Sequence, residues 1–416
     1  MNILVLGSGG REHTIVWKLS LSDSVTSIHV IPGNPGMADI ATTANISLSD
    51  QEEILAYAVE NSVNLVVVGP EQPLVDGIAD RFREKGIKVF GPGKTGAQLE
   101  GSKIFSKEFM VRHGILTSKF DVFTNKEEAV KGIEKYSYPL VIKVDGLAAG
   151  KGVLIPKTRE EAIEDLSCIF DERKFGDAGD RVLVEEFISG FEASILCLVD
   201  NNNIVPLESA RDYKKAYDED KGLNTGGMGA ISPNDKLTDE MISLVEKDVL
   251  KKTLNGLKKD NIDFNGVLFI GLIINEDNEP YILEYNVRFG DPETQSVIPK
   301  MKNDLAEVFM KTVDNELDRL ELEWDERIAV TTILASGGYP ESYEKGKEIT
   351  FGNIDDDVMI FHAGTKLEDG KLVTDGGRVL GVTTLAEDKY KAREKIYKNI
   401  DKIHFDGKMY RTDIGL

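Results

Sequence analysis

Short apolar runs alternate with segments of helical spacing over the first hundred residues. The apolar runs lie at 2–7, 26–31, 64–69 and 87–91, and the helical segments lie between them at 11–20, 50–61 and 73–85. Apolar runs of this length, separated by helices, are typical of parallel strands that are buried on both faces. The pattern therefore predicts a doubly wound α/β domain at the N-terminus.

The pattern changes after residue 102. A helix is expected at 102–113, a mixed block of strands and helices continues to about 188, and longer strands and the helix 238–260 follow. The runs GVLFIGLIIN (266–275) and EPYILEY (279–285) are joined by a short polar turn, which predicts an antiparallel hairpin. A strand-rich tail ends in a helix at 387–401. We expect an α/β and α+β multidomain fold with domains at 1–102, 103–322 and 326–416, and a smaller subdomain at about 118–188.

Composition and charge narrow the choice of partners. The 416 residues are 41% apolar and 29% charged, as in an ordinary globular protein, and the formal net charge is −22. That charge argues against nucleic acid or an anionic membrane as the main partner, but it is compatible with a local basic pocket for a small anion. Cys168 and Cys197 lack disulfide or zinc spacing, and no signal peptide or membrane-length apolar stretch occurs, so a cytoplasmic protein is expected.

Two glycine-rich motifs resemble nucleotide loops without matching them. GSGGREH (7–13) joins the first strand to a helix, which is a ready anion site, but Glu12 stands where the third glycine of G-x-G-x-x-G belongs. GPGKTG (91–96) has Lys88 where a P-loop needs its first glycine. A phosphate-bearing substrate or a purely structural turn fits the first motif better than a dinucleotide, and a turn is the better interpretation of the second.

The stretch VIKVDGLAAGKGVLI (141–155) indicates phosphate binding. Lys143 lies within an apolar strand, where a lysine is costly unless it meets an anion. Glycines surround Lys151 in the following loop, and a glycine-rich strand–loop–strand can direct its N–H groups at phosphates. Glu185, Glu186 and Glu192 follow another apolar strand and could line a nucleoside pocket. The alternatives are a flexible hairpin with exposed lysines and an edge strand with a solvated face.

The stretch EYNVRFGDPETQ (284–295) carries the clearest chemistry. Glu284, Asn286 and Arg288 occupy every second position, which in a strand directs them to one face. A carboxylate and an amide are oxygen ligands suited to Mg²⁺, and a guanidinium can hold a carboxylate or a phosphoryl group. Asp291 adds a further anion nearby. The alternative is a structural cluster of ion pairs.

Taken in order, these motifs resemble the ATP-grasp ligases, and within them the phosphoribosylamine–glycine ligase family. The resemblance runs from residue 1 to about 415 and rests on GSGGREH, VGPEQPLVDGI, GAQLEGSK, IKVDGLAAGKGV, FGDAGDRVLVEEFISGFEAS, NTGGMGAISP, EYNVRFGDPETQ, FHAGT and GGRVLGVT. It implies a central ATP-grasp domain with a mobile lid at about 118–188. It also implies the ATP-dependent joining of glycine to 5-phosphoribosylamine through glycyl phosphate, giving glycinamide ribonucleotide, ADP and phosphate in purine biosynthesis.

The resemblance also implies roles for individual residues. The ATP side would comprise Lys103, Lys143, Gly146, Gly150, Lys151, Gly152, Glu185, Glu186, Ile188 and Glu192, and Mg²⁺ or Mn²⁺ would lie on Glu284 and Asn286. Gly9, Gly10, Arg11, Pro70, Glu71, Lys214, Asn224, Thr225, Gly226 and Gly227 would bind the substrates, and Arg288, Asp212 and Asp291 would act in catalysis. A transient hand-off from the enzyme that makes phosphoribosylamine is left open.

The chain departs from the family pattern at one substrate segment. It reads RDYKK at 211–215 where the family usually has Gln-Asp-His-Lys-Arg, and Leu223 replaces a usual proline. The changes leave the reaction class intact but put substrate contacts at 211–215 in question. Two other hypotheses remain at this stage: a different ATP-grasp ligase, such as a biotin carboxylase-type enzyme, and a nucleotide-binding regulator without catalysis.

Overall fold

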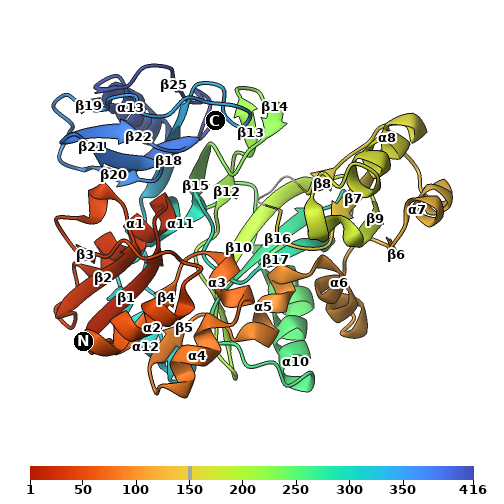
Figure 1. Ribbon diagram of the computed structural model, residues 1–416, viewed down its shortest axis with the longest axis horizontal. Coiled ribbons are helices and arrows are strands. Elements are labelled where there is room, and N and C mark those ends of the chain that lie inside the picture. Colours follow the sequence, from red (N-terminus) through yellow and green to blue (C-terminus); the bar gives the residue numbers. More distant parts are fainter. Residues whose placement is uncertain (149–151) are drawn as a thin grey trace.

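The N-terminal domain contains a parallel sheet, as the apolar runs predict. The computed structural model describes residues 1–148 and 152–416, and in it the strand order is β3-β2-β1-β4-β5 (Figure 1). The strands are β1 (Asn2–Gly7), β2 (Ser27–Pro32), β3 (Thr42–Thr43), β4 (Leu65–Val68) and β5 (Lys88–Phe90). The helices are α1 (Gly10–Leu19), α2 (Gln51–Glu60), α3 (Glu71–Val75), α4 (Ile78–Glu84) and α5 (Lys94–Gly101). The central strand β1 pairs in parallel with β2 and β4.

The central domain is built on an antiparallel sheet in the order β11-β10-β16-β17. Its strands are β10 (Phe191–Val199), β11 (Ile204–Pro206), β16 (Gly266–Ile274) and β17 (Pro280–Asn286), with helices α6 (Lys103–Arg112), α9 (Asp239–Val245), α10 (Lys251–Lys259), α11 (Glu293–Val297) and α12 (Leu305–Val313). The predicted hairpin β16–β17 is confirmed. Every residue of β16 is buried, which explains its uninterrupted apolar sequence. Between α9 and α10 the helix widens into a π segment at Glu246–Leu250.

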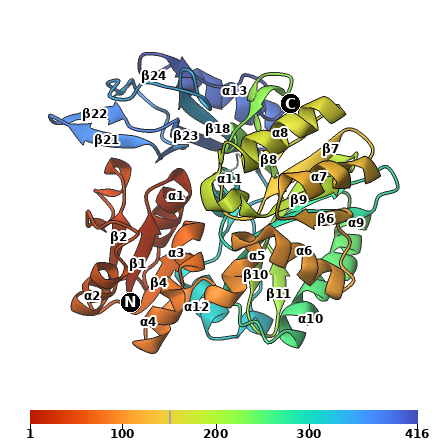
Figure 2. The same cartoon turned by 45° about the vertical axis from the view of Figure 1, so that its right-hand side comes forward.

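A small lobe extends from the central domain on the right of Figure 1 and turns forward in Figure 2. Its sheet has the order β6-β9-β7-β8, with strands β6 (Phe120–Phe123), β7 (Leu140–Val144), β8 (Val153–Leu154) and β9 (Val182–Glu186), and with helices α7 (Lys126–Gly132) and α8 (Arg159–Phe170). Thr158 caps α8 by accepting a hydrogen bond from the Glu161 N–H. The lobe has a hydrophobic core of its own, in which Ile142, Leu166 and Val184 are fully buried.

The C-terminal sheet recruits strands from the middle of the chain. Its order is β12-β15-β18-β23-β20, and β25 also pairs with β18. The strands are β12 (Arg211–Asp212), β15 (Gly229–Ser232), β18 (Ile328–Ser336), β20 (Val358–His362), β23 (Arg378–Ala386) and β25 (Lys408–Met409), with helix α13 (Lys389–Ile400) on the sheet. Smaller ribbons are β13 (Lys215–Tyr217) with β14 (Lys221–Asn224), β19 (Thr350–Phe351) with β24 (Ile403–His404), and β21 (Thr365–Glu368) with β22 (Lys371–Thr374). The segment 211–232 is therefore shared between two domains.

The hydrophobic clusters show which domains are packed against one another. Two hydrophobic clusters each contain residues of both the N-terminal and the central sheets: Leu4 with Tyr285 in one, and Val5 with Val267 in the other. The C-terminal sheet and the lobe at 120–186 have clusters of their own. No helix in the described ranges is both long and apolar enough to cross a membrane.

Candidate active site

The row Glu284, Asn286 and Arg288 lies on one face, as the two-residue spacing predicts. The register shifts beside it, because Gly271 pairs with Glu284 whereas Leu272 pairs with Ile282. The Asn286 amide donates to Glu284 Oε1 over 3.3 Å, and Arg288 Nη2 donates to Asn286 Oδ1 over 3.2 Å. The three side chains thus form a continuous polar row along the end of β17.

Positive charge converges on Glu284 from three parts of the chain. The loss of surrounding water alone would raise the pKa of Glu284, but Lys214, Lys143 and Lys103 bring it below its ordinary value. Burial lowers the pKa of Lys103, whose ammonium donates to the Gly146 carbonyl over 2.8 Å. Lysines around one exposed carboxylate form a site suited to a phosphate chain and a cation.

A buried ionic cluster attaches the small lobe to the central domain. Glu185 is 2% exposed, and its Oε2 lies 3.1 Å from Lys143 Nζ and 3.0 Å from Lys107 Nζ. Ser118 Oγ donates to the same oxygen over 2.7 Å, whereas Oε1 has no hydrogen-bond partner among the residues that the structure describes. Lys143 also donates to the Leu283 carbonyl of β17 over 3.2 Å. Burial alone would raise the pKa of Glu185, but the two lysines hold it below its ordinary value.

The other residues predicted for the ATP side surround this cluster. Glu186 Oε1 accepts from the Lys119 N–H over 2.8 Å, Ile188 is half-buried after β9, and Glu192 is exposed at the start of β10. Gly146 has φ of +147°, a conformation that glycine adopts most readily. Gly152 is buried against Val144, and Gly150 and Lys151 lie outside the described residues.

The N-terminal domain brings an arginine and two acids to the other side of the row. Arg11 Nη1 donates to the Phe289 carbonyl over 3.0 Å, and Glu12 Oε2 accepts from the Gly9 N–H over 2.7 Å. Glu12 therefore binds the backbone of the glycine turn and pairs with Arg11. Glu71, which follows Pro70 at the start of α3, has its Oε2 3.3 Å from Arg288 Nε. A Cβ atom at Gly10 would lie 2.6 Å from Gln295 Nε2, so a larger residue there would require the Gln295 side chain to move.

Asp291 links this corner to the C-terminal domain. Its Oδ1 accepts from Gln295 Nε2 over 2.7 Å and lies 3.3 Å from Arg378 Nη1. Arg378 also donates to the carbonyls of Asp291, over 2.8 Å, and Gly226, over 2.6 Å. In the loop at 224–227, Thr225 Oγ1 accepts from the Gly227 N–H over 2.9 Å. Burial alone would raise the pKa of Asp291, but Arg378 and Arg11 lower it.

Asp212 and Glu293 form an acidic pair whose members are close enough for Asp212 to raise the pKa of Glu293 and for Lys214 to lower the pKa of both. Burial and Glu192 raise the pKa of Asp212, against the opposing charge of Lys214. Glu293 is 4% exposed, and burial together with Asp212 raises its pKa to about 8. The raised pKa favours the protonated form of Glu293 near neutral pH.

Comparisons with known proteins decide the family. Three family models match in succession: the N domain of phosphoribosylglycinamide synthetase at residues 1–100, its ATP-grasp (A) domain at 101–294, and its C domain at 329–416. A phosphoribosylamine–glycine ligase of Halalkalibacterium halodurans is 46% identical over 416 residues, covering 100% of this chain and 96% of its own length. One of Clostridium acetobutylicum is 46% identical over 415 residues, covering 100% and 99%.

The chain belongs to the phosphoribosylamine–glycine ligase family. The crystal structure of the ligase from Thermotoga maritima superposes with a TM-score of 0.87 at 38% identity, covering 99% of this chain and 100% of that one. The biotin carboxylase domain of the Hydrogenobacter thermophilus 2-oxoglutarate carboxylase, at 18% identity and a TM-score of 0.77, shares the fold alone. The expected ATP-grasp fold and the expected ligase activity in purine biosynthesis are thereby confirmed.

Several residues of this ligase site were missed from the sequence. Glu100 lies 3.0 Å from Arg288 Nη2 and accepts from the Val287 N–H over 2.8 Å, and burial raises its pKa to about 7. Lys107, Glu293 and Arg378 were missed as well, although Glu100, Glu293 and Arg378 stand in the motifs GAQLEGSK, GDPETQ and GGRVLGVT. A charged residue within a glycine-rich motif is the signal that could have identified these three.

Proposed function

We propose that this ligase works through glycyl phosphate. An oxygen of the glycine carboxylate attacks the γ-phosphorus of ATP, and the bond from that phosphorus to the β,γ-bridging oxygen breaks to release ADP. The amine of 5-phosphoribosylamine then attacks the glycyl carbonyl carbon, loses a proton and displaces phosphate. The observation that carries the proposal is the polar row on β17, which has lysines on one side and Arg11 and Glu71 on the other. Transfer of this kind needs positioning and charge neutralisation rather than a covalent nucleophile.

On the ATP side, we assign the phosphates to Lys103, Lys143 and the loop that begins at Gly146. The edge formed by Glu185, Glu186 and Ile188 would hold the adenine, and Glu192 the ribose hydroxyls. Support comes from polar groups that are free to bind a ligand. Glu185 Oε1 is buried without a hydrogen-bond partner in the described part of the chain, and Glu192 is exposed. ATP binding itself follows from the family, whereas these individual contacts are proposals.

Glu284 and Asn286 fit a divalent metal ion that is shared with nucleotide phosphates. They offer one carboxylate and one amide, and the described residues contain no group of three or more His, Cys, Asp or Glu side chains that could hold an ion alone. Mg²⁺ commonly uses one or two carboxylates together with phosphates and water, and Mn²⁺ accepts the same oxygen ligands. Bound there, the ion would neutralise phosphate charge. A related biotin carboxylase domain has been crystallised with the magnesium salt of ADP.

On the substrate side, we assign the sugar phosphate to Gly9, Gly10 and Arg11, and its ribose to Pro70 and Glu71. Glycine and the attacking amine would lie among Asp212, Lys214, Asp291 and the loop Asn224–Gly227. Arg288 would stabilise the transferred phosphoryl group, because its guanidinium stands at the inner end of the polar row. Of this acidic pair, Asp212 would accept the proton that the amine loses, because a carboxyl group that is already protonated, as the pKa of about 8 implies for Glu293, cannot accept one.

We further propose that the lobe at 118–188 closes over the site as a lid. Its separate hydrophobic core allows it to move as a body, and an acyl phosphate needs protection from water. The instability of phosphoribosylamine would also favour a direct hand-off from the enzyme that makes it.

Trapping the intermediate tests this route. The enzyme with ATP, Mg²⁺, glycine and hydroxylamine, but without phosphoribosylamine, is expected to release ADP and form glycine hydroxamate, which mass spectrometry detects. The same mixture with phosphoribosylamine, generated from ammonia and phosphoribosyl pyrophosphate, should instead give glycinamide ribonucleotide. The acyl phosphate intermediate would be ruled out if the enzyme formed glycinamide ribonucleotide but gave neither hydroxamate nor glycine-dependent ADP release. That result would favour a concerted reaction.

A further inference from the structure

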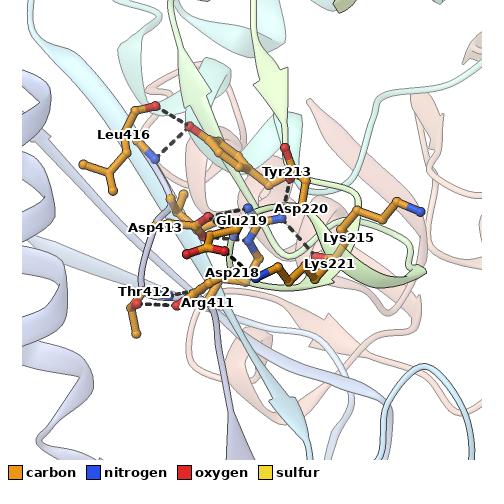
Figure 3. A network of polar contacts seen from close by, with 12 residues as sticks. Tyr213, Lys215, Asp218, Glu219, Asp220, Lys221, Arg411, Thr412, Asp413 and Leu416 are labelled. Atoms are coloured by element: carbon orange, nitrogen blue, oxygen red, sulfur yellow. Dashed lines mark hydrogen bonds and ion pairs between the residues drawn. The ribbon is translucent and has the colours of Figure 1, made fainter.

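The hairpin β13–β14 is fastened to the last residues of the chain. We call residues Arg411–Leu416 the C-terminal clamp. Figure 3 shows the clamp beside the hairpin, with the Arg411 side chain joined to hairpin residues by polar contacts. The hairpin begins directly after Lys214 and leads into the substrate loop at 224–227. Residues separated by about 200 positions are thus joined beside the active site.

Arg411 is the centre of this contact. Its side chain is 1% exposed, and its Nε and Nη2 each donate to Asp413 over 2.7 Å. Nη1 donates to Asp220 Oδ1 over 2.8 Å and to the Lys215 carbonyl over 3.2 Å. A buried guanidinium with two carboxylates and a backbone carbonyl is fixed in one orientation.

Tyr213 is held between two arginines. The guanidinium carbon of Arg411 lies 5.1 Å from the centre of the Tyr213 ring, and that of Arg211 lies 5.0 Å from it. The Tyr213 hydroxyl accepts from Arg211 Nη2 over 2.5 Å and from the Gly415 N–H over 2.9 Å, and Arg211 also donates to the Leu416 carbonyl. Cation–π contacts and hydrogen bonds therefore fix the ring at its face and at its tip. The departures Arg211 and Tyr213 from the family pattern both serve this contact.

The clamp also holds the tip of the hairpin. Glu219 and Asp220 have φ of +59° and +52°, a conformation that costs free energy in residues other than glycine. The Glu219 N–H donates to Asp413 Oδ2 over 2.9 Å, and Asp218 Oδ1 accepts from the Thr412 N–H over 2.7 Å. The tip therefore depends on the clamp for its conformation.

Lys214 lies between the two fixed points. The ring of Tyr213 before it and the carbonyl of Lys215 after it are both held by Arg411, and its own carbonyl accepts from the Thr225 N–H over 2.7 Å. Its ammonium lies 2.9 Å from Glu192 Oε2. Burial alone would lower the pKa of Lys214, but Asp212, Glu192 and Glu284 raise it above its ordinary range. The lysine is thus charged and directed at the site by backbone that the clamp immobilises.

We propose that Arg411 is a positioning residue of the ligase and acts by holding Lys214 toward the bound substrate. The inference rests on the proposed role of Lys214 at the glycine and amine side. It assigns a catalytic consequence to the clamp, although none of the clamp residues belongs to the proposed substrate contacts.

The test compares Arg411→Met and Tyr213→Phe with the control Tyr397→Phe. The Tyr397 hydroxyl donates to the Arg411 carbonyl over 2.9 Å on the side facing α13, so the control removes a similar hydrogen bond without touching the hairpin. Arg411→Met is expected to raise the KM for glycine about tenfold and Tyr213→Phe about threefold, with less than a twofold change in the KM for ATP. Tyr397→Phe should lower Tm but leave both KM values unchanged. If Arg411→Met does not fold, Tyr213→Phe carries the comparison.

A double-mutant cycle with Lys214→Met separates the two proposals. Arg411→Met should add almost nothing to the KM for glycine once Lys214 is absent, because both changes remove the same interaction. Full additivity would overturn the positioning role and leave a purely structural clamp. An unchanged KM and kcat in Lys214→Met itself would instead overturn the proposed role of Lys214. An equal KM shift in Tyr397→Phe would also contradict the inference, since it would show that the side-chain contacts of Arg411 are not what positions Lys214.

Discussion

The lobe at 120–186 and the segment 213–224, which contains the β13–β14 hairpin, both bring a lysine toward Glu284, but they are stabilised in opposite ways. The lobe has its own core of ten buried residues and holds Lys143 through the Glu185 cluster. The hairpin has no such core and is fixed from outside by Arg411 and the end of the chain. A unit with an independent core can move as a body, whereas a hairpin bound by a buried arginine keeps one position. We infer that the ATP side is the moving side of the site and the substrate side the fixed one.

Replacing Glu284 should have the largest effect on the reaction rate, because lysines of both the ATP side and the substrate side lie near its carboxylate. Glu284→Ala removes the carboxylate that faces Lys214, Lys143 and Lys103, and kcat should fall roughly 100- to 1000-fold. ADP release with both substrates measures it. The exposed turn residue Glu276 provides the matched control, since Glu276→Ala should leave the rate unchanged. A Glu284→Ala enzyme with normal turnover would show that the reaction does not depend on the carboxylate shared by the ATP side and the substrate side.

Replacing Glu185 should destabilise the lobe more than the rest of the protein. Glu185→Gln leaves Lys107 and Lys143 without their buried anion and should destabilise the lobe by about 3 kcal/mol, which amide hydrogen exchange over 120–186 measures. Glu134→Gln, a substitution at an exposed position of the lobe, is the control. Exchange that accelerates equally in the N-terminal sheet would show that the lobe is not an independent body.

The same cluster predicts a pH dependence. The pKa of Glu185 is lowered in the folded protein, so its contribution to stability is complete above the pKa of about 4.3 of an unfolded glutamate and is lost as the pH falls through the lower folded value. Protection of the lobe should therefore decline as the pH falls below about 4.3, and this decline should be smaller in Glu185→Gln.

Replacing Glu293 should give the smallest effect and the opposite sign. Its pKa is raised to about 8, so the folded state holds a proton that the unfolded state releases, and stability falls as the pH rises from about 4.3 to 8. Glu293→Gln, a neutral mimic, should be more stable than the native enzyme at pH 8.5 by on the order of 2 kcal/mol and equally stable at about pH 4. Thermal unfolding at the two values checks this, with the exposed Glu240→Gln as control. Equal Tm values at pH 8.5 would mean that the pKa of Glu293 is not raised in the folded protein.

Local patterns in the sequence predicted much of this fold. The alternation of apolar runs and helices predicted the parallel sheet, the turn between 275 and 279 predicted the β16–β17 hairpin, and the two-residue spacing predicted the row Glu284, Asn286 and Arg288. Each of these depends on neighbours within a few residues, where side-chain direction follows directly from secondary structure. The assignment of that row to metal and phosphoryl transfer stays a prediction.

What the sequence determined by itself was therefore the family, the type of chemistry and the faces on which the polar residues lie. Only the tertiary structure decided their partners: Glu100 beside Arg288, Lys107 beside Glu185, and Arg411 beneath the hairpin. These pairs join segments far apart in the chain. The sequence around a charged residue does not indicate which oppositely charged residue will lie beside it in the fold. Burial makes the pairing obligatory, because an unpaired charge inside the protein is too costly, but the fold alone chooses the partner.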